Sequence, residues 1–376
     1  MPDALRFLDS AACKDIEAPP DAPPFKGGWV GYFSYDLGRA FEALPALARD
    51  DLHLPLAVFC YHPFVFAIDH QTNRHFAIQD ESVEPAQLLP SPRASPLRRF
   101  DATSTFTRPA YLAAVRRVLD YIAAGDVYQV NLSQRLSVGV EGRYPAEIYE
   151  RLQRHSPSQF GALLDYGDWA LISNSPELFV RIEQAPTGCR RIITRPIKGT
   201  RPRAPGMASE LRDSIKDQAE LAMIVDLERN DLGRVCRVGS VRVSQPREIE
   251  EHPTVYHGAA TVEGLLRDDA RLIDILGAMF PGGSVTGAPK IRAMQIIEEL
   301  EPVRRGPYCG AIGFISADGT VQFNLAIRTI IIRNGVAHVP VGGGIVADST
   351  PAEEYDETLV KSRAMLGALG IEAPTP

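Results

Sequence analysis

The chain has 376 residues, of which 45% are apolar and 23% charged, and its formal net charge is −7. Ordinary hydrophobicity with modest charge excludes a mainly disordered protein, and the acidic balance argues against nucleic acid as the main partner. The length allows two modest domains or one large one.

The composition also argues against a membrane or secreted protein. No apolar run approaches the ~18–20 residues of a membrane span. The first residues carry acids and prolines rather than a basic start and an apolar stretch. The five cysteines are widely spaced and form neither a disulfide framework nor a CxxC metal site. We therefore expect a cytoplasmic protein with reduced thiols.

The first part of the chain predicts strands between loops. Residues 14–26 and 80–104 are rich in proline and polar residues, so both are expected to be loops. Residues 27–37 and 56–70 are rich in aromatic and β-branched residues and are expected to be strands. Residues 108–126 place apolar side chains at helical spacing and end near a glycine, which predicts a helix.

Three antiparallel strands are expected near the C-terminus, at residues 309–316, 321–332 and 336–346. Asp318-Gly319 and Asn334-Gly335 separate them, and both dipeptides suit type I′ hairpin turns. Strand meanders with interspersed long helices favour an α+β fold over a series of βαβ units. The remaining long helices are expected at residues 207–229, 288–300 and 351–369.

Two acidic helix faces are candidate metal ligands. Asp217 and Glu220 lie three residues apart at the head of an apolar run, and a carboxylate there is costly unless it is paired or metal-bound. In the last helix Glu354, Glu357 and Lys361 share one face. If the two helices face each other, Glu220 and Glu357 present oxygen ligands to Mg²⁺. The alternatives are an ordinary surface pair and a solvated acidic first turn.

The start of the last helix carries a capping signature. Thr350 is the expected N-cap residue, and Pro351 suits the first helical position. Glu353 stands three residues after Thr350, which is the spacing of a capping box.

Two features near the C-terminus can bind an anion. Alternation puts Arg328 on one strand face with Asn324 and Ile330. An arginine there needs a partner, either a protein carboxylate, which is the commoner case, or a substrate carboxylate held bidentately. A triple glycine ending a strand lets the backbone approach an anion closely, or else forms a flexible loop; here it is Gly342, Gly343 and Gly344.

Lys198 is a candidate nucleophile. It follows a β-rich stretch, and three arginines surround it in the sequence: Arg195, Arg201 and Arg203. Nearby positive charges depress the pKa of a lysine, and the neutral amine is then a usable nucleophile. A solvated basic turn is the alternative.

Nine motifs carry a family resemblance. They are GDVYQVNLSQR (125–135), SPELF (175–179), TRPIKGTRPR (194–203), AELAMIVDLERNDLGR (219–234), PGGSVTGAPKIRAM (281–294), YCGAIGF (308–314), AIRT (326–329), GGGIVADS (342–349) and DETLVKSR (356–363). In this order they resemble the chorismate-utilising enzymes, which include anthranilate, isochorismate and aminodeoxychorismate synthases. The resemblance covers about residues 27–370.

The resemblance implies an α+β fold in which two stacked antiparallel β-sheets carry helices on the outside and hold the site between them. The N-terminal part is expected to be shortened, because the motifs begin only at GGW, residue 27. Residues 1–104 would be this shortened strand-rich region of the same folded unit. Residues 105–376 would be the chorismate-binding catalytic region.

Two residues make the sequence most similar to the aminodeoxychorismate synthase branch of the family. Lys198 stands in PIKGT, where anthranilate synthases usually have alanine. In that branch the lysine is thought to attack C2 of chorismate and expel the C4 hydroxyl, after which ammonia enters at C4. Gln129 stands where isochorismate-type enzymes have a lysine that activates water. The resemblance therefore implies the product 4-amino-4-deoxychorismate, in p-aminobenzoate and folate biosynthesis.

The resemblance also implies roles for the other motif residues. Glu177 would be the general acid for the C4 oxygen, and Thr200 and His257 would line the ring near it. Mg²⁺ would be held by Glu220 and Glu357, with Asp217 and Glu354 as outer carboxylates. The substrate carboxylates would meet Arg328, Tyr308, Gly342, Gly343, Gly344 and Lys361.

The partners implied are chorismate and ammonia. No cysteine stands in the G-x-C-x-G turn of a glutaminase, so ammonia is expected from a separate glutaminase subunit or from solution. Two other readings stay open: an anthranilate or isochorismate synthase-type enzyme, and a non-catalytic chorismate-binding subunit.

Overall fold

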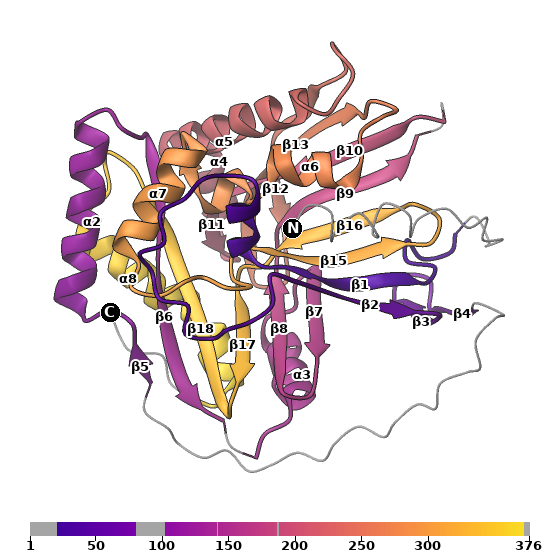
Figure 1. The fold of residues 1–376 in the computed structure, drawn as a ribbon, viewed down its shortest axis with the longest axis horizontal. Coiled ribbons are helices and arrows are strands. Elements are labelled where there is room, and N and C mark those ends of the chain that lie inside the picture. The colour runs from indigo at the N-terminus through magenta and orange to yellow at the C-terminus, as the bar shows by residue number, and fades with distance from the viewer. Residues whose placement is uncertain (1–20, 80–101, 141, 186–187, 372–376) are drawn as a thin grey trace.

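The structure is a computed structural model that describes residues 21–79, 102–140, 142–185 and 188–371. Within these residues the strands form two large antiparallel sheets and one separate hairpin, with helices outside them (Figure 1). The fold is therefore the expected α+β class. The loop predicted at 80–104 lies almost wholly outside the described residues, as does the first half of the loop predicted at 14–26.

The larger sheet has nine strands among the described residues. The N-terminal strand β1 pairs with β15, from the last quarter of the chain, so the two ends of the sequence share one sheet. The spatial order is β11 (Ile197–Pro202), β13 (Val255–Leu265), β10 (Arg190–Arg195), β9 (Leu178–Gln184), β16 (Val321–Leu325), β15 (Ala311–Ser316), β1 (Gly28–Phe33) and β2 (Ala57–His62), with β12 (Arg242–Glu251) beside β13.

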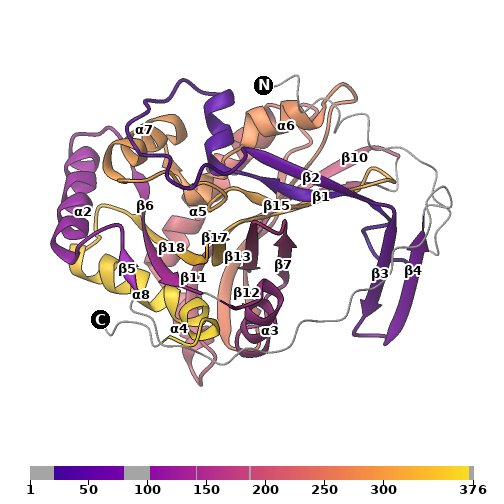
Figure 2. The same cartoon turned by 60° about the horizontal axis from the view of Figure 1, so that its bottom comes forward.

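The smaller sheet has seven strands within the described part of the chain. Their order is β14 (Gly287–Ala288), β6 (Gln129–Gly139), β18 (Val336–Ile345), β17 (Thr329–Arg333), β8 (Trp169–Ser175) and β7 (Phe160–Asp165), with β5 (Thr103–Ser104) beside β6. Its strands cross those of the larger sheet (Figure 1). A hairpin of β3 (Phe64–Asp69) and β4 (Arg74–Gln79) projects from one end (Figure 2).

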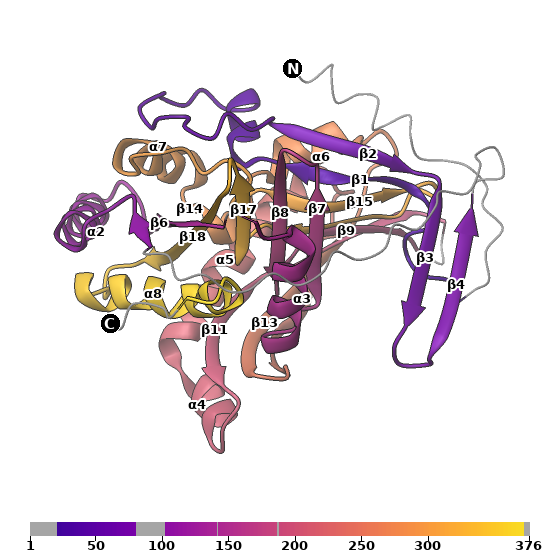
Figure 3. The ribbon, with the colours of Figure 1, turned by 90° about the horizontal axis from the view of Figure 1, so that it is seen from below.

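Helices cover the outer faces of the sheets. In the described residues they are α2 (Arg108–Ala123), α3 (Pro145–His155), α4 (Met207–Asp213), α5 (Ile215–Gly233), α6 (Leu272–Met279), α7 (Lys290–Leu300) and α8 (Pro351–Ala368), with short 3₁₀ helices η2 (Tyr35–Ala40) and η3 (Gly283–Val285). Helix α8 packs on β18, and α5 packs on β11 and β13. Figure 3 shows α8 and α5 approaching the same region from the two sheets.

The main core lies between the two sheets. It joins Tyr32, Phe33 and Phe323 of the larger sheet to Leu171 and Ile331 of the smaller one. All five side chains are fully buried. Burying side chains of this size supplies most of the free energy that holds the sheets together. A second cluster fills the space between the smaller sheet and helices α3 and α8. The stacking is therefore as the resemblance implied.

The single strand predicted at 321–332 is wrong. The chain leaves β16 of the larger sheet and enters β17 of the smaller sheet, so the segment forms two strands. Arg328 lies in the link with a φ of +49°, a left-handed conformation that a continuing strand cannot adopt. The predicted alternation of Arg328 with Asn324 and Ile330 therefore fails.

The prediction of a single helix at 207–229 is also wrong, because these residues belong to two helices, α4 and α5. The segment is interrupted at Ser214, whose backbone is extended and whose Oγ accepts a hydrogen bond from Asp217 N at 3.3 Å. Ser214 thus ends α4 and caps α5. The helices expected at 108–126, 288–300 and 351–369 are present as α2, α7 and α8.

One of the two predicted type I′ turns is present, and the predicted capping box is not. Asn334 and Gly335 both have positive φ, as the predicted type I′ turn requires, whereas only Gly319 of the other dipeptide does. The capping box at Thr350 is not formed, because its Oγ1 donates to Glu353 Oε2 at 2.6 Å instead of accepting from the backbone. No helix in the described ranges is long and apolar enough to cross a membrane.

Candidate active site

The predicted site residues come from both sheets and from helices α5 and α8. Segments far apart in the sequence thus contribute to one place in the fold, as the contacts below show. The residues are Gln129 of β6, Glu177 between β8 and β9, Lys198 and Thr200 of β11, Asp217 and Glu220 of α5, His257 of β13, Arg328 between β16 and β17, Gly342, Gly343 and Gly344 of β18, and Glu354, Glu357 and Lys361 of α8.

Lys198 is largely buried among carboxylates. Burial lowers its pKa below the ordinary value, and Glu220 and Glu177 oppose that shift. Strand β13 approaches the lysine backbone closely, since a Cβ at Gly258 would lie 2.6 Å from the Lys198 carbonyl oxygen. The Lys198 backbone therefore lies close against β13, and burial of the side chain favours the neutral amine more than in a solvated lysine.

The three neighbouring arginines do not cause this shift, so that part of the prediction is wrong. The main influences on the pKa of Lys198 are burial and the charges of Glu220, Glu177, Lys361 and Glu357, and none of these is an arginine. Each arginine is neutralised by its own carboxylate: Arg195 by Glu248 and Glu250, Arg201 by Glu210 and Asp217, and Arg203 by Glu251. Burial is the largest cause of the lowered pKa, and the charge of Lys361 adds to it.

Glu177 is a buried carboxyl with the properties of a general acid. It is 4% exposed, and Ser284 Oγ donates a hydrogen bond to its Oε1 at 2.7 Å. Burial raises its pKa above the ordinary value, although Ser284, Lys198 and Arg328 favour the ionised form. A carboxyl with a raised pKa keeps its proton to higher pH and can donate it.

The triple glycine forms part of strand β18, so the flexible-loop alternative does not hold. A Cβ at Gly343 would lie 2.9 Å from Glu354 Oε2 and 3.5 Å from Glu357 Oε1. The missing side chain therefore lets two carboxylates of α8 lie over the strand. Lys361 Nζ binds the same strand, donating to the Gly342 carbonyl at 2.9 Å.

The candidate metal carboxylates lie together. Glu357 is among the groups that raise the pKa of Glu220, after burial, and it acts likewise on Glu354. Glu354 Oε1 accepts from Ser349, while its buried Oε2 has no partner among the described residues. Asp217 is paired with Arg201 at 3.0 Å. The cluster thus offers carboxylate oxygens, one of them unused.

Arg328 has no protein carboxylate within ion-pair distance in the described part of the chain, which favours the substrate alternative. Burial lowers its pKa below the ordinary value, and Glu177 opposes this. Its guanidinium still stays charged at any physiological pH. Tyr308 is 4% exposed, and burial raises the pKa of its hydroxyl well above the ordinary value. Its role beside Arg328 stays a prediction.

Three further predicted residues carry polar groups at the site. Gln129 is fully buried, and neither its Oε1 nor its Nε2 has a hydrogen-bond partner among the residues described. A Cβ at Gly344 would lie 3.2 Å from that Nε2, so the glycine leaves the amide open. Thr200 Oγ1 and His257 Nδ1 lie 2.9 Å apart on the paired strands β11 and β13.

His257 is neutral at working pH. Burial, with Arg328 and His252 nearby, lowers its pKa to about 3. It can therefore exchange hydrogen bonds with Thr200 but adds no positive charge to the site.

Two groups behind the site, Ser284 and Glu228, are not predicted from the sequence. Ser284 holds Glu177, as described above, and only the motif PGGSVTGAPKIRAM pointed to its region. Glu228 of α5 is 6% exposed and accepts from Thr194 Oγ1 at 2.9 Å. Burial and the charge of Glu177 raise the pKa of Glu228 well above its ordinary value. No spacing rule marks Glu228, because only the fold buries it.

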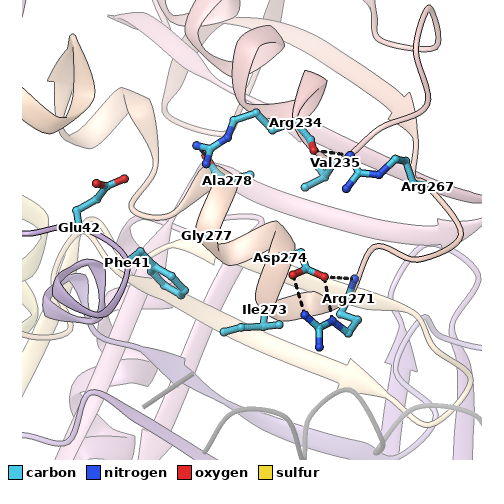
Figure 4. A pocket seen from close by; sticks show the side chains of 10 residues that line it. All are labelled: Phe41, Glu42, Arg234, Val235, Arg267, Arg271, Ile273, Asp274, Gly277 and Ala278. Atoms are coloured by element: carbon cyan, nitrogen blue, oxygen red, sulfur yellow. Dashed lines mark hydrogen bonds and ion pairs between the residues drawn. The ribbon is translucent and has the colours of Figure 1, made fainter. Parts of the chain in front are cut away.

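A separate cavity of about 470 Å³ lies beside α6, and no predicted site residue lines it (Figure 4). Its lining includes three arginines and two carboxylates, and one ion pair is formed among them. Arg271 pairs with Asp274 at 3.0 Å, and Arg267 binds the Arg234 carbonyl oxygen. The cavity is therefore distinct from the site between the sheets.

Comparison with known proteins agrees with this geometry. The sequence matches the model of the chorismate binding enzyme family over residues 3–367. It is 43% identical to anthranilate synthase component 1 of Thermus thermophilus, over 98% of this chain and 82% of the relative. It is 42% identical to aminodeoxychorismate synthase component 1 of Salmonella typhimurium, over 92% of this chain and 77% of the relative.

A solved structure supports the same assignment. Anthranilate synthase component I from Streptococcus pneumoniae matches with a TM-score of 0.85 at 33% identity, covering 96% of this chain and 85% of that one. The family match, the relatives and the shared fold lead to one conclusion: the chain belongs to the chorismate binding enzymes, a family that uses chorismate as substrate.

Proposed function

We propose that the chain converts chorismate and ammonia to 4-amino-4-deoxychorismate and water. The observation that carries this proposal is the environment of Lys198, a largely buried amine with a lowered pKa that lies near Glu177 and Glu220. Attack at C2 of chorismate needs a neutral amine, and this environment favours one. Alanine at the same position could not form the covalent adduct.

Two residues, Lys198 and Glu177, account for the bonds and protons of the proposed reaction. Lys198 Nζ bonds to C2 while the C4 hydroxyl leaves as water, taking a proton from Glu177. Ammonia then bonds to C4, the bond between Lys198 and C2 breaks, and the proton lost by the new ammonium group returns to Glu177. Burial raises the pKa of Glu177, which supports its role as the first proton donor.

The two carboxylates of chorismate would have separate anchors. Arg328 would bind the enolpyruvyl carboxylate with Tyr308, because no described carboxylate pairs with the guanidinium. The ring carboxylate would face Lys361 and the backbone of Gly342, Gly343 and Gly344. Gln129 would offer its unpartnered amide to the incoming ammonia.

The carboxylates of α5 and α8 fit Mg²⁺ chemically. We propose that Glu220 and Glu357 hold the cation, with Asp217 and Glu354 around it; the unused Glu354 Oε2 supports this. When bound, Mg²⁺ offsets the charge of a substrate carboxylate. In the described residues no group of three or more His, Cys, Asp or Glu side chains could hold a metal alone. A cation that retains waters and takes substrate oxygens suits such a site.

We also propose that ammonia comes from a separate glutaminase subunit. The relatives named above are both called component 1, which implies a second component in those proteins. The purified chain should then use ammonium but not glutamine as its nitrogen source.

Product analysis tests the proposed reaction. The purified chain is incubated with chorismate, Mg²⁺ and ammonium at a pH that supplies free ammonia, and the products are separated and identified by mass. We expect 4-amino-4-deoxychorismate. Anthranilate as the main product would overturn the proposal and establish the second candidate, an anthranilate synthase, which the 43% identity to the Thermus thermophilus protein favours.

A further inference from the structure

Lys361 joins the carboxylate cluster to the glycine strand. Its Nζ lies 2.6 Å from Glu357 Oε1, one helical turn away on α8, and it donates to the Gly342 carbonyl at 2.9 Å. These contacts use two of the three N–H groups of the ammonium. The Lys361 side chain is 40% exposed, so its third N–H remains available to solvent or a ligand.

Glu357 has two competing uses. The ion pair with Lys361 occupies one of its oxygens, and the proposed function assigns the same carboxylate to Mg²⁺. Partial burial would raise the pKa of Glu357, but Lys361 lowers it below the ordinary value. An ammonium and a divalent cation on one carboxylate repel each other, so one weakens the binding of the other.

The other carboxylates of the cluster can support a cation that displaces Lys361 from Glu357. Glu354 is 5% exposed, and its Oε2 has no partner among the described residues, while it lies over Gly343. The charge of Glu357 is among the influences that raise the pKa of Glu220 on α5, and Glu220 forms no ion pair with Lys361 in the described residues. An incoming cation therefore finds one free oxygen and one oxygen that the lysine already holds.

We propose that Lys361 is a positioning residue with two successive partners. Without a metal its ammonium neutralises Glu357. When a cation enters the cluster, Lys361 is released from Glu357 and turns to the substrate carboxylate beside Gly342. Metal binding thereby prepares the substrate site. This inference rests on the proposed site, but not on which product the enzyme forms.

The test measures Mg²⁺ binding to the full chain without chorismate, by titration calorimetry. Replacing Lys361→Met removes the competing ammonium and keeps the length of the side chain. We expect Mg²⁺ to bind about three- to tenfold more tightly, the range that a half-exposed ion pair supplies. Chorismate binding should weaken in the same variant, because the substrate carboxylate loses its ammonium.

Two further variants make the test specific. Lys361→Arg retains the positive charge and should leave Mg²⁺ affinity near that of the wild type. Lys26→Met removes a lysine that pairs with Asp318, in the turn between β15 and β16, and should change neither affinity. Unchanged or weaker Mg²⁺ binding by Lys361→Met overturns the inference. Product analysis of the wild type is independent of this result, so a failure of the proposed reaction is seen separately.

Discussion

Lys198 carries the residue-scale prediction for the chemistry. Lys198→Ala removes the only group proposed to bond to C2, so turnover should fall by roughly 10²–10⁴-fold. Intact mass spectrometry after mixing with chorismate should show an adduct on the wild type and none on the variant.

A nearby lysine provides the matched control. Lys216 lies in the first turn of α5 and is exposed. Lys216→Ala should keep the adduct. Equal adduct formation by the wild type and Lys198→Ala would exclude Lys198 as its site.

Gln129 supports a prediction in which stability and activity move in opposite directions. Its amide is buried without a partner among the described residues, which costs about 1–3 kcal/mol. Gln129→Met should therefore raise the free energy of unfolding, measured in urea, while slowing ammonia-dependent turnover. A variant with unchanged turnover would show that the amide takes no part in amination.

At the scale of single residues, the sequence predicts which residues carry the chemistry. It does not predict what shifts their pKa values or which of them the fold buries. The acidic face of α5 and Arg328 are predictable because a charged group in an apolar segment needs a partner, and Lys198 because it stands among arginines in the sequence. The arginines around Lys198 were credited wrongly, because a sequence does not show that each has a carboxylate on another strand. Glu228 was missed, because its burial depends on how α5 packs.

Strand β18 and helix α8 allow a matched pair of glycine substitutions at the scale of elements. Gly343→Ala places a methyl 2.9 Å from Glu354 Oε2, so it should displace the carboxylate and weaken chorismate and Mg²⁺ binding at least tenfold. Gly367→Ala in α8 meets nothing within 4 Å and should stabilise the fold by up to about 1 kcal/mol.

Thermal unfolding and binding titrations of both variants check this pair. Normal binding by Gly343→Ala would show that strand β18 does not need its glycine at the carboxylates, and equally weak binding by Gly367→Ala would show that the loss is not specific to Gly343.

Elements with local signals were predicted well, and those set by distant contacts were not. The spacing that gave α2 and the dipeptide that gave the turn at Asn334 act over a few residues. Where β16 ends and β17 begins depends on which sheet each strand joins, and an unbroken apolar run conceals that point. Ser214 likewise splits a continuous helical pattern because its own side chain caps the following turn.

His338 gives a prediction for the stability of the whole molecule. It lies on β18 beside Ser137 at 2.9 Å, and burial together with Arg135 lowers its pKa to about 4. The unfolded chain takes up a proton near pH 6.5 that the folded chain refuses, so stability should fall as the pH drops from about 6.5 to about 4. The loss can reach about 3 kcal/mol.

Urea unfolding at pH 7 and pH 4.5 measures this loss. His338→Asn should show a smaller difference between the two pH values than the wild type, whereas His70→Asn, at an exposed position, should show the same difference. An equal pH dependence in all three proteins would mean that His338 titrates normally in the folded state.

For the molecule as a whole, the sequence patterns predict the α+β class but not the stacking of the sheets. Pairing β1 with β15 joins residues near the two ends of the described chain, and no local pattern encodes such a contact. The stacked sheets followed only from the family resemblance. The site has the same origin, because its residues from Gln129 to Lys361 meet only after both sheets have packed.

The link that carries Arg328 has a consequence for how a bound ligand stabilises the fold. Ala326 N donates to the Gly310 carbonyl before β15 at 2.9 Å, and the Arg328 carbonyl accepts from Asn174 N of β8 at 3.0 Å. The arginine is thus clamped between the two sheets, and a ligand bound to it ties them together. Chorismate at a hundred times its Kd should add about 2.7 kcal/mol to global stability. Its presence should slow amide hydrogen exchange in both sheets at once, and protect the enzyme from proteolysis while it works.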